Sequence, residues 1–503
     1  MRQMFAPLAF MLAIAGAASA QAPGAVATRP ADTNVPAAAL QADVQVLRQA
    51  YEALHPGLYR YNTPAAMGLH FDSLAAALGH DQSLAQAYVT IARFLNLIEC
   101  GHTFPNPYNQ KDRVLGEVVT VAGRVPFYFR WLDGRMIVTR NVSSDSALVR
   151  GTEVLAINGV SSADILRQLL PLSRADGSND AKRVANLEVL EIERYSAFDV
   201  YYPLVFPVPS GPWMFEVRSP AGKVRQVALM PVSDAARSVV ADSVGSEGQD
   251  SLTPPWTLRQ LDSSTAVLTM PTWVTYNNHW DWQGFIHRAF TELVARGTPN
   301  LVIDLRGNEG GTGVGDVILQ HLVDVPLALS ASEHFTRYQR IPPGLRPYLD
   351  TWDRSFDDWG TAAVPSTSRP GFYRMTKYDD GQDGVVIQPA APRYRGNVWV
   401  LVGPENSSAT FEFALAVKQH NLATLVGRPT GGNQRGINGG AFYFLRLPNS
   451  GIEVDLPLIA QFPREPQPDA GIAPDVLVVP SVQDIAAGVD AELEAVLARI
   501  QRN

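Results

Sequence analysis

Cysteine is almost absent from this chain, and the absence limits its chemistry. Cys100 is the only cysteine among 503 residues, so no intrachain disulfide can form. No Cys and His residues have zinc-site spacing, and the HExxH pattern of zinc peptidases does not occur. We therefore expect no metal and no other cofactor. Cys100 itself is expected to be a buried, unreactive thiol.

The chain also lacks an excess of basic residues, and it lacks long apolar runs beyond its N-terminus. The chain has 41 Lys and Arg against 49 Asp and Glu, a formal net charge of −8, which argues against a nucleic-acid partner. Beyond the N-terminus, no segment approaches the roughly 20 consecutive apolar residues that a membrane-spanning helix needs. We expect no membrane span.

The N-terminus instead predicts export. Residues 1–20 contain one basic residue, Arg2, then an apolar run over 5–18 and a small-x-small cleavage site at 18–20. This is the pattern of a secretory signal peptide. No cysteine follows the cleavage site to carry a lipid. The mature protein is expected to be periplasmic or secreted.

A protein of this length is expected to have two or three domains. Changes in composition divide the first half of the chain. Residues 21–37 are rich in Ala, Pro and Thr and predict a disordered linker. Residues 38–110 predict a small helical domain, because apolar residues recur at helical spacing over 38–54 and 83–97.

Residues 111–231 predict a β-rich module. One helix is expected at 163–170, and Asp-Gly and Asn-Gly turns separate short β-prone runs at 118–121, 127–132, 136–139, 153–157, 214–217 and 224–230. The segment 150–159, RGTEVLAING, resembles the G-D-x-I-x-x-I-N-G segment of PDZ domains, with Thr152 in place of Asp. The resemblance implies a PDZ-like, peptide-binding module; the alternative is a plain structural β-module. The polar residues 232–255 predict a linker.

From residue 256 to the end at 503, strands and helices are expected to alternate. The predicted strands are 265–270, 301–305 and 398–402, and the predicted helices are 281–295, 314–322 and 410–419. Such alternation predicts an α/β fold with a mostly parallel sheet covered by helices. Its functional site should lie at the carboxyl ends of the strands. A long insertion over 326–396, rich in aromatic residues, is expected to form a lid or a wall of the substrate site.

Two adjacent serines stand at a predicted strand–turn–helix junction at that end. Ser407 and Ser408 follow the strand 398–402 and precede the helix 410–419. Unpaired N–H groups at a helix start would stabilise an oxyanion formed beside either serine. The alternative is that a serine there only caps the helix.

Four segments in order carry a resemblance to a known family. They are LVIDLRGNEGG at 301–311, SATFEFALA at 408–416, GRPTGG at 427–432 and GIAPD at 471–475. They are similar to the I-D-L-R-x-N-x-G-G, S-A-x-E-x-F-A, G-E-x-T-G-G and G-I-x-P-D segments of the tail-specific (C-terminal processing) serine peptidases, in particular the tricorn-core-like branch. The resemblance implies a crotonase-like (ClpP-like) βα core and a peptide or protein substrate.

The resemblance also implies roles for individual residues. Ser408 matches the nucleophile, and the N–H groups of Ala409 and of Gly310 or Gly311 match the oxyanion hole. Glycine suits that place, since a residue without Cβ lets the backbone approach an incoming carbonyl closely. The glutamate expected three residues after the nucleophile is displaced to Glu412, so Ser407 remains the alternative.

The general base is the next assignment. One branch of the family uses a lysine after its T-x-G segment, but the chain has no lysine over 430–434. The tricorn-like branch uses an upstream histidine in G-D-G-H-T, which ECGHT at 99–103 resembles. The resemblance implies that His102 is the base, a role suited to its pKa. For the third, orienting acid, Asp469 is preferred over Glu465.

These expectations combine into an exported serine-type endopeptidase that hydrolyses peptides through an acyl-enzyme. Two alternatives remain on the same fold. One is a catalytically inactive peptide- or ligand-binding protein, which the displaced Glu412 favours. The other is a non-peptidase hydrolase, because one fold can host several chemistries.

Overall fold

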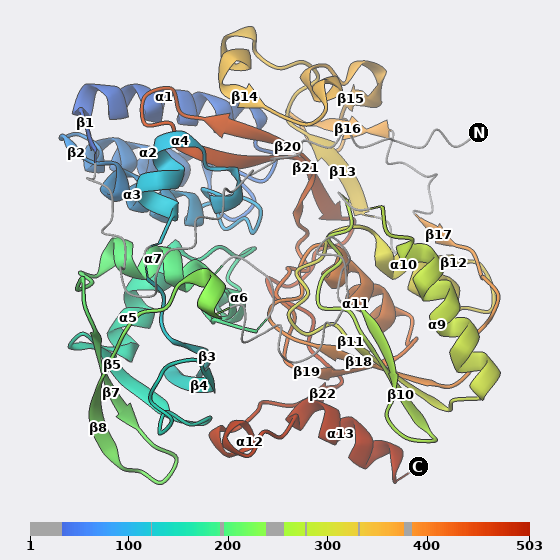
Figure 1. Ribbon diagram of the computed structural model, residues 1–503. Coiled ribbons are helices and arrows are strands. Elements are labelled where there is room, and N and C mark those ends of the chain that lie inside the picture. The colour runs from blue at the N-terminus through green and yellow to red at the C-terminus, as the bar shows by residue number, and fades with distance from the viewer. Residues whose placement is uncertain are drawn as a thin grey trace.

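The computed structural model describes residues 33–121, 123–191, 196–237, 256–276, 279–329, 332–376 and 385–502 (Figure 1). The predicted signal peptide and residues 238–255 of the predicted linker lie outside this part. None of the helices in the described ranges is long and apolar enough to cross a bilayer.

The described chain begins with helices α1 (Ala37–Leu54), α2 (Pro64–Ala77) and α3 (Leu84–Asn96). α1 and α3 confirm the two predicted helices, and α3 starts at a capping box formed by Ser83 and Gln86. α2 is not among the predicted helices. Strand β1 (Asn34–Val35) pairs with β2 (Gln82–Ser83), so the disordered linker predicted over 21–37 is wrong for its last residues.

An antiparallel sheet of order β3-β4-β5-β7-β8, with β6 beside β5, forms the predicted β-rich module. Its strands are β3 (Phe127–Leu132), β4 (Arg135–Asn141), β5 (Glu153–Ile157), β6 (Val160–Ser161), β7 (Trp213–Arg218) and β8 (Val224–Leu229). Three helices accompany the sheet: α5 (Ser162–Leu169), α6 (Asp180–Asn186) and α7 (Ala197–Val205).

The strand predicted at 118–121 is wrong. Val118 and Val119 belong to the π-helical turn Leu115–Val119, which continues α4 (Asp112–Val114). Val114 and Val118 are both buried, and their spacing of four places them on one side of a helical segment. A short apolar run fits either a strand or a helix, and here the tertiary contact decides.

The second half of the chain contains the predicted mostly parallel sheet, of order β22-β19-β18-β11-β10-β9, in which only β9 is antiparallel to its neighbour. Its strands are β9 (Thr257–Gln260), β10 (Thr265–Thr269), β11 (Asn300–Asp304), β18 (Asn397–Val402), β19 (Thr424–Gly427) and β22 (Val476–Leu477).

Helices cover both faces of this sheet because alternate strand residues are buried on opposite sides. Helices α9 (Trp282–Arg296), α10 (Val314–Gln320) and α11 (Ala409–Gln419) share one apolar cluster with the sheet. On the other face Val302 and Leu401 pack with Val496 of α13 (Ala491–Ile500), which follows α12 (Val482–Ala487).

A further sheet, of order β14-β20-β21-β13-β16-β15, is centred on the long hairpin of β20 (Asn438–Arg446) and β21 (Glu453–Pro463). The region predicted as an insertion, 326–396, supplies its other strands: β13 (Ser332–Thr336), β14 (Leu349–Asp350), β15 (Ala363–Pro365) and β16 (Tyr373–Met375). β12 (Leu327–Ala328) and β17 (Val386–Ile387) pair separately. The hairpin runs from α1 towards the parallel sheet (Figure 1).

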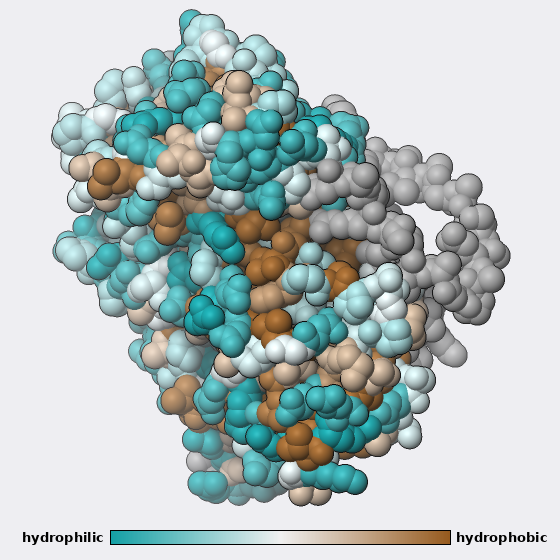
Figure 2. All heavy atoms as spheres, turned by 90° about the vertical axis from the view of Figure 1, so that its left-hand side faces the viewer, coloured by the Kyte–Doolittle hydropathy of each residue, from teal (hydrophilic) through white to brown (hydrophobic). Residues whose placement is uncertain are grey.

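The largest hydrophobic core crosses the predicted domain boundaries. It contains buried residues of α1–α3, of the β-rich module and of the β20–β21 hairpin, including Tyr51, Phe129 and Tyr443. Figure 2 shows the side of the molecule that carries these helices and the module, where apolar groups gather in a hollow at mid-height between mainly hydrophilic parts. The helices and the hairpin therefore form one packed body beside the parallel sheet.

Candidate active site

The candidate nucleophile lies at the junction between β18 and α11. Ser408 precedes α11 with φ 52° and ψ −129°, a conformation that residues other than glycine rarely adopt. Its side chain makes no capping hydrogen bond. Ser407 is only 7% exposed, and its hydroxyl donates to the Glu309 carbonyl oxygen at 3.2 Å. Of the two serines, Ser408 therefore has the uncommitted hydroxyl.

The glycine turn after β11 lies directly against this junction. A methyl group added at Gly310, where φ is 101°, would lie 2.9 Å from the Ala409 nitrogen and 3.0 Å from Ser408 Cβ. One added at Gly311 would lie 2.3 Å from the Trp273 carbonyl oxygen. Both positions require glycine, because a side chain at Gly310 would push the glycine turn away from the serine junction and one at Gly311 would push it away from Trp273.

The three predicted oxyanion-hole donors differ in their hydrogen bonds. The Gly310 N–H donates to Asn308 Oδ1 at 2.9 Å. Within the described residues, no acceptor is found for the N–H of Gly311 or of Ala409. These two N–H groups are thus available to a negatively charged oxygen beside Ser408.

Two fully buried asparagines join the turns. The side chain of Asn406 donates to the carbonyl oxygens of Leu305 at 2.7 Å and Asn308 at 3.0 Å. Asn308 in turn donates to the Met270 carbonyl oxygen at 2.8 Å. Sequence analysis did not single out either residue, although Asn308 occupies the asparagine of the I-D-L-R-x-N-x-G-G segment. Their hydrogen bonds fix the position of Ser408 relative to the glycine turn.

His102 lies in the loop after α3, against β20, with its ring centroid 5.8 Å from that of Phe442. The loop is held on both sides of the histidine: the Gly101 N–H donates to Asp176 Oδ1 at 2.8 Å, and Thr103 Oγ1 lies 2.8 Å from His55 Nε2. His102 Nδ1 is buried and has no hydrogen-bond partner in the described part of the chain.

An ion-pair cluster connects the histidine loop to the serine junction. Arg174 donates to the Gly101 carbonyl oxygen at 2.5 Å and pairs with Glu309 at 3.1 Å. The nearly fully buried Lys182, from α6, pairs with Glu309 at 2.8 Å and donates to the Glu405 carbonyl oxygen at 2.9 Å. Glu309 directly precedes Gly310, so these contacts bring the His102 loop and the Ser408 turn into one region.

The predicted triad is not joined by hydrogen bonds. Among the residues described, none links His102 to Ser408. Asp469 accepts from the Asn433 side chain at 2.6 Å and from the Ser178 N–H at 3.2 Å. Glu465 is exposed. The acid that acts most strongly on the charge of His102 is Asp176, a buried residue that the sequence did not single out.

Burial sets the protonation of the titratable groups in this region. It lowers the pKa of His102, and the charge of Asp176 partly opposes the shift. His102 is consequently a neutral imidazole, able to accept a proton, over a wider pH range than an exposed histidine. Burial raises the pKa of the Cys100 thiol to about 11, so the thiol is protonated and unreactive, as expected.

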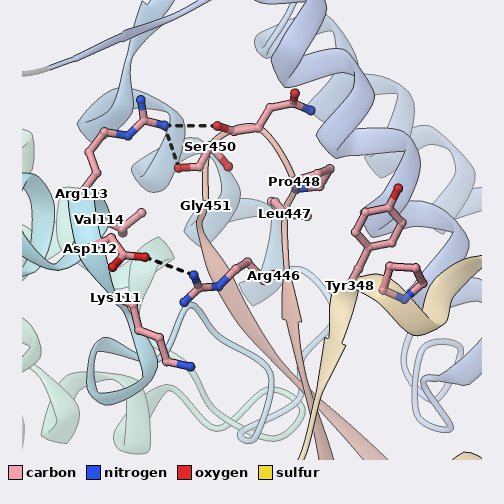
Figure 3. Close-up of a pocket in the computed structure, with 12 residues that line it drawn as sticks. Lys111, Asp112, Arg113, Val114, Tyr348, Arg446, Leu447, Pro448, Ser450 and Gly451 are labelled. Atoms are coloured by element: carbon pink, nitrogen blue, oxygen red, sulfur yellow. Dashed lines mark hydrogen bonds and ion pairs between the residues drawn. The ribbon is translucent and has the colours of Figure 1, made fainter.

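A cavity of about 440 Å³ lies elsewhere, at the turn of the β20–β21 hairpin (Figure 3). Arg113 donates there to the carbonyl oxygens of Asn449 and Ser450, and Arg446 pairs with Asp112 at 3.3 Å. None of the residues lining it belongs to the serine junction or the histidine loop. In the described ranges, no group of three or more His, Cys, Asp or Glu side chains could hold a metal ion.

Residues 264–478, from the start of β10 to just beyond β22, match the model of peptidase family S41. This part of the chain is a peptidase family S41 domain. All four segments singled out in the sequence, 301–311, 408–416, 427–432 and 471–475, lie within the match. S41 is a family of serine peptidases, so the predicted family and enzyme class are confirmed.

Solved structures with a similar overall fold include mature CPAF complexed with lactacystin. It has 16% sequence identity and a TM-score of 0.60, covering 92% of this chain and 97% of that one. Mature CPAF alone gives 16% identity and a TM-score of 0.58, covering 90% and 94%. The likeness shows a mixed α/β S41 peptidase fold with N-terminal helices and several β-sheets. No curated protein matches the chain in sequence.

Proposed function

We propose that this S41 family member is an exported endopeptidase that cleaves peptide bonds through an acyl-enzyme, with Ser408 as nucleophile and His102 as general base. The carrying observation is the Ser408 junction: an uncommitted hydroxyl at a helix start, in a strained conformation, beside two free N–H groups. Strain of this kind persists where the surrounding structure imposes it, and it is concentrated at functional sites.

In the proposed reaction, His102 Nε2 accepts the Ser408 Oγ proton as Oγ attacks the scissile carbonyl carbon. The carbonyl oxygen becomes an oxyanion between the N–H groups of Ala409 and Gly311. The imidazolium then gives its proton to the leaving amine, and the acyl group stays on Oγ. A water molecule, activated by His102, attacks the ester and releases the acid. Each oxyanion donor typically contributes a factor of about 10²–10³ in rate.

Catalysis requires His102 Nε2 to come within about 2.6–3.2 Å of Ser408 Oγ, and such contacts often tighten only when substrate is bound. The Arg174–Glu309–Lys182 cluster supports the proposal because it holds the two loops near one another. For the electrostatic role of the third residue we favour Asp176 over Asp469 and Glu465, because its charge opposes the lowered pKa of His102 most strongly.

The proposal extends to the other parts of the chain. The mostly parallel sheet and its helices are proposed as a crotonase-like core, and the sheet around β5, which carries RGTEVLAING, as a PDZ-like module that binds a peptide. Export rests on the signal-peptide pattern of residues 1–20. Cell fractionation with and without residues 2–20 tests it, and equal amounts of both forms in the exported fraction would contradict it.

One observation favours a binding protein without catalysis, namely the absence of a hydrogen bond between His102 and Ser408. A fluorophosphonate probe decides between the two functions, because it reacts only with an activated serine. We expect the probe to label Ser408, as mapped by mass spectrometry. Ser408→Ala should abolish labelling and peptide hydrolysis with a melting temperature within a few degrees of the parent.

Ser407→Ala is the matched control. It removes one hydrogen bond, worth about 1 kcal/mol, and should leave labelling in place. If Ser407→Ala abolishes labelling and Ser408→Ala does not, the nucleophile is Ser407. If neither substitution changes probe labelling and the parent protein does not cleave peptides, the protein is a binding protein without catalysis.

A further inference from the structure

A cluster of arginines and aromatic rings lies on the sheet that contains the β20–β21 hairpin. Phe462, near the end of β21, has the Arg60 guanidinium 4.2 Å from its ring centroid and the Arg369 guanidinium 3.8 Å from it. Arg337 lies 5.0 Å from the Phe372 ring. The rings of Phe335, Phe372 and Phe462 are mutually 6.0–6.1 Å apart.

The positive charge of this cluster is poorly balanced. Among the described residues, no carboxylate lies within ion-pair distance of Arg60, Arg337 or Arg369. Glu333 acts on Arg369 only at longer range. Burial lowers the pKa of both Arg60 and Arg369, and the two charges repel one another. Three cations gathered without an acid cost free energy, which a bound anion would recover.

The three arginines are not equivalent. Arg60 donates to the carbonyl oxygens of Arg435, Ile437 and Gln461 and to Asn438 Oδ1, at 2.7–3.2 Å. It is therefore a structural anchor. The side chains of Arg337 and Arg369 make no hydrogen bond within the described ranges. A guanidinium stacked on a ring keeps its N–H edge available for a carboxylate, which it binds with two parallel hydrogen bonds.

Two connections place the cluster beside the candidate active site. Gln461, next to Phe462, lies close enough to Glu412 to lower the pKa of its carboxyl group, and the Glu412 N–H donates to the Ser408 carbonyl oxygen at 3.0 Å. On the other side, Asn438 bonds both Arg60 and the Cys100 thiol, two residues before His102. An extended peptide advances about 3.3 Å per residue, so a substrate lying over Ser408 can reach the cluster within a few residues.

We propose that Arg337 and Arg369, supported by Phe372 and Phe462, form a subsite that binds acidic side chains of the peptide substrate. The proposal rests on the peptidase function proposed above and names its substrate class. A local cationic site on a chain of net charge −8 would select acidic segments at this place, while the remaining surface repels them. The occupant is thus an Asp- or Glu-containing peptide segment.

A binding experiment with the full chain carrying Ser408→Ala separates this proposal from catalysis. The probes are fluorescein-labelled, C-terminally amidated peptides with four Ala-Glu repeats or four Ala-Gln repeats, titrated by fluorescence anisotropy. We expect the acidic peptide to bind at least tenfold more tightly. Arg337→Gln with Arg369→Gln should abolish the difference. The control Arg288→Gln, on the exposed face of α9, removes one positive charge elsewhere and should preserve it.

Any other binding result overturns the proposal. Equal binding of the two peptides, or loss of the difference in the Arg288→Gln control, means that no acidic subsite exists at Arg337 and Arg369. Tighter binding only when the peptide carries a free C-terminal carboxylate assigns the cluster to chain ends instead. Tighter binding of a single-stranded oligothymidylate assigns it to nucleic acid. If the acidic peptide binds selectively but the fluorophosphonate probe does not label Ser408 in the parent chain, the subsite proposal stands and the peptidase function is rejected.

Discussion

Asp176 supplies the charge that His102 experiences most strongly, and it does so while holding the loop in place. Its Oδ1 accepts the Gly101 N–H at 2.8 Å, and its negative charge favours the imidazolium. Burial acts in the opposite direction and is the larger effect. The basicity of His102 is thus a balance between loss of water, which the charges of Arg174 and Lys182 reinforce, and the carboxylates of Asp176 and Glu309.

This balance predicts the pH dependence of activity. Because burial lowers the pKa of His102, kcat/KM should rise through a pKa below the ordinary 6.5. Asp176→Asn keeps an oxygen for the Gly101 N–H but removes the charge, so the acidic limb should move to still lower pH. pH–rate profiles on one peptide test this.

Asp469→Asn is the matched control for that profile, because Asp469 is bonded to Asn433 and Ser178. If Asp469→Asn moves the acidic limb and Asp176→Asn does not, the third residue is Asp469. Acid should also destabilise the fold: unfolded His102, with its ordinary pKa, takes up a proton first, so this contribution to stability declines as pH falls below 6.5.

At the scale of elements, α1 and the hairpin turn are coupled by one buried carboxylate. Asp43 of α1 accepts hydrogen bonds from the Asn449 N–H and side chain, both at 2.9 Å, and from the Ser450 N–H at 2.8 Å. These residues form the turn between β20 and β21 beside the cavity of Figure 3. Asp43 fixes one end of a hairpin whose other end lies at His102.

Asp43→Ala should therefore lower the free energy of unfolding by roughly 3 kcal/mol, because buried N–H groups lose their acceptor. Urea unfolding followed by circular dichroism measures the change. Asp72→Ala, which removes an exposed partner of Arg48, should cost less than about 1 kcal/mol. Equal effects of the two substitutions would show that the turn does not depend on Asp43.

Elements were predictable from the sequence where their pattern is local. α3 follows from the Ser83 start signal and helical spacing, and β18, the glycine turn and α11 follow from an apolar run, a polar turn and an amphipathic segment. The strands of 326–396 are absent from the prediction, since their pairing joins distant residues such as Phe335 and Ala460. The β20–β21 hairpin is absent too, although its own pairing, for example of Arg446 with Glu453, is local. Asp176 and Lys182 join the site only through tertiary contacts, which no local pattern reveals.

At the scale of the whole molecule, the proposed base and the proposed nucleophile belong to different packed bodies. His102 belongs to the body that contains α1–α3 and the hairpin, and Ser408 to the parallel sheet and its helices. The hairpin follows Ser408 in the sequence, yet its buried side chains pack with helices from the first part of the chain. The Tyr51 hydroxyl, for instance, donates to the Asp455 carbonyl oxygen at 2.8 Å.

This arrangement predicts how a chain beginning at Thr253 behaves. Such a fragment contains Ser408, the glycine turn and the hairpin, but lacks His102 and the helices that cover the hairpin. Several side chains that are fully buried in the intact chain, among them Tyr443, Leu456 and Leu458, lose much of their cover. Burial of each is worth roughly 1.5–3 kcal/mol, so the fragment should bind a hydrophobic dye, aggregate and fail to hydrolyse peptides.

Co-expression of residues 33–237 with the fragment should restore solubility and part of the activity, since it returns both the base and the missing half of the core. The matched control is the same pair with His102→Ala, which should restore solubility without hydrolysis. Solubility without hydrolysis in the His102→Ala pair would show that the N-terminal body contributes to the chemistry as well as to the packing of the core. A fragment from Thr253 that is soluble, folded and fully active would instead require a base within residues 253–503.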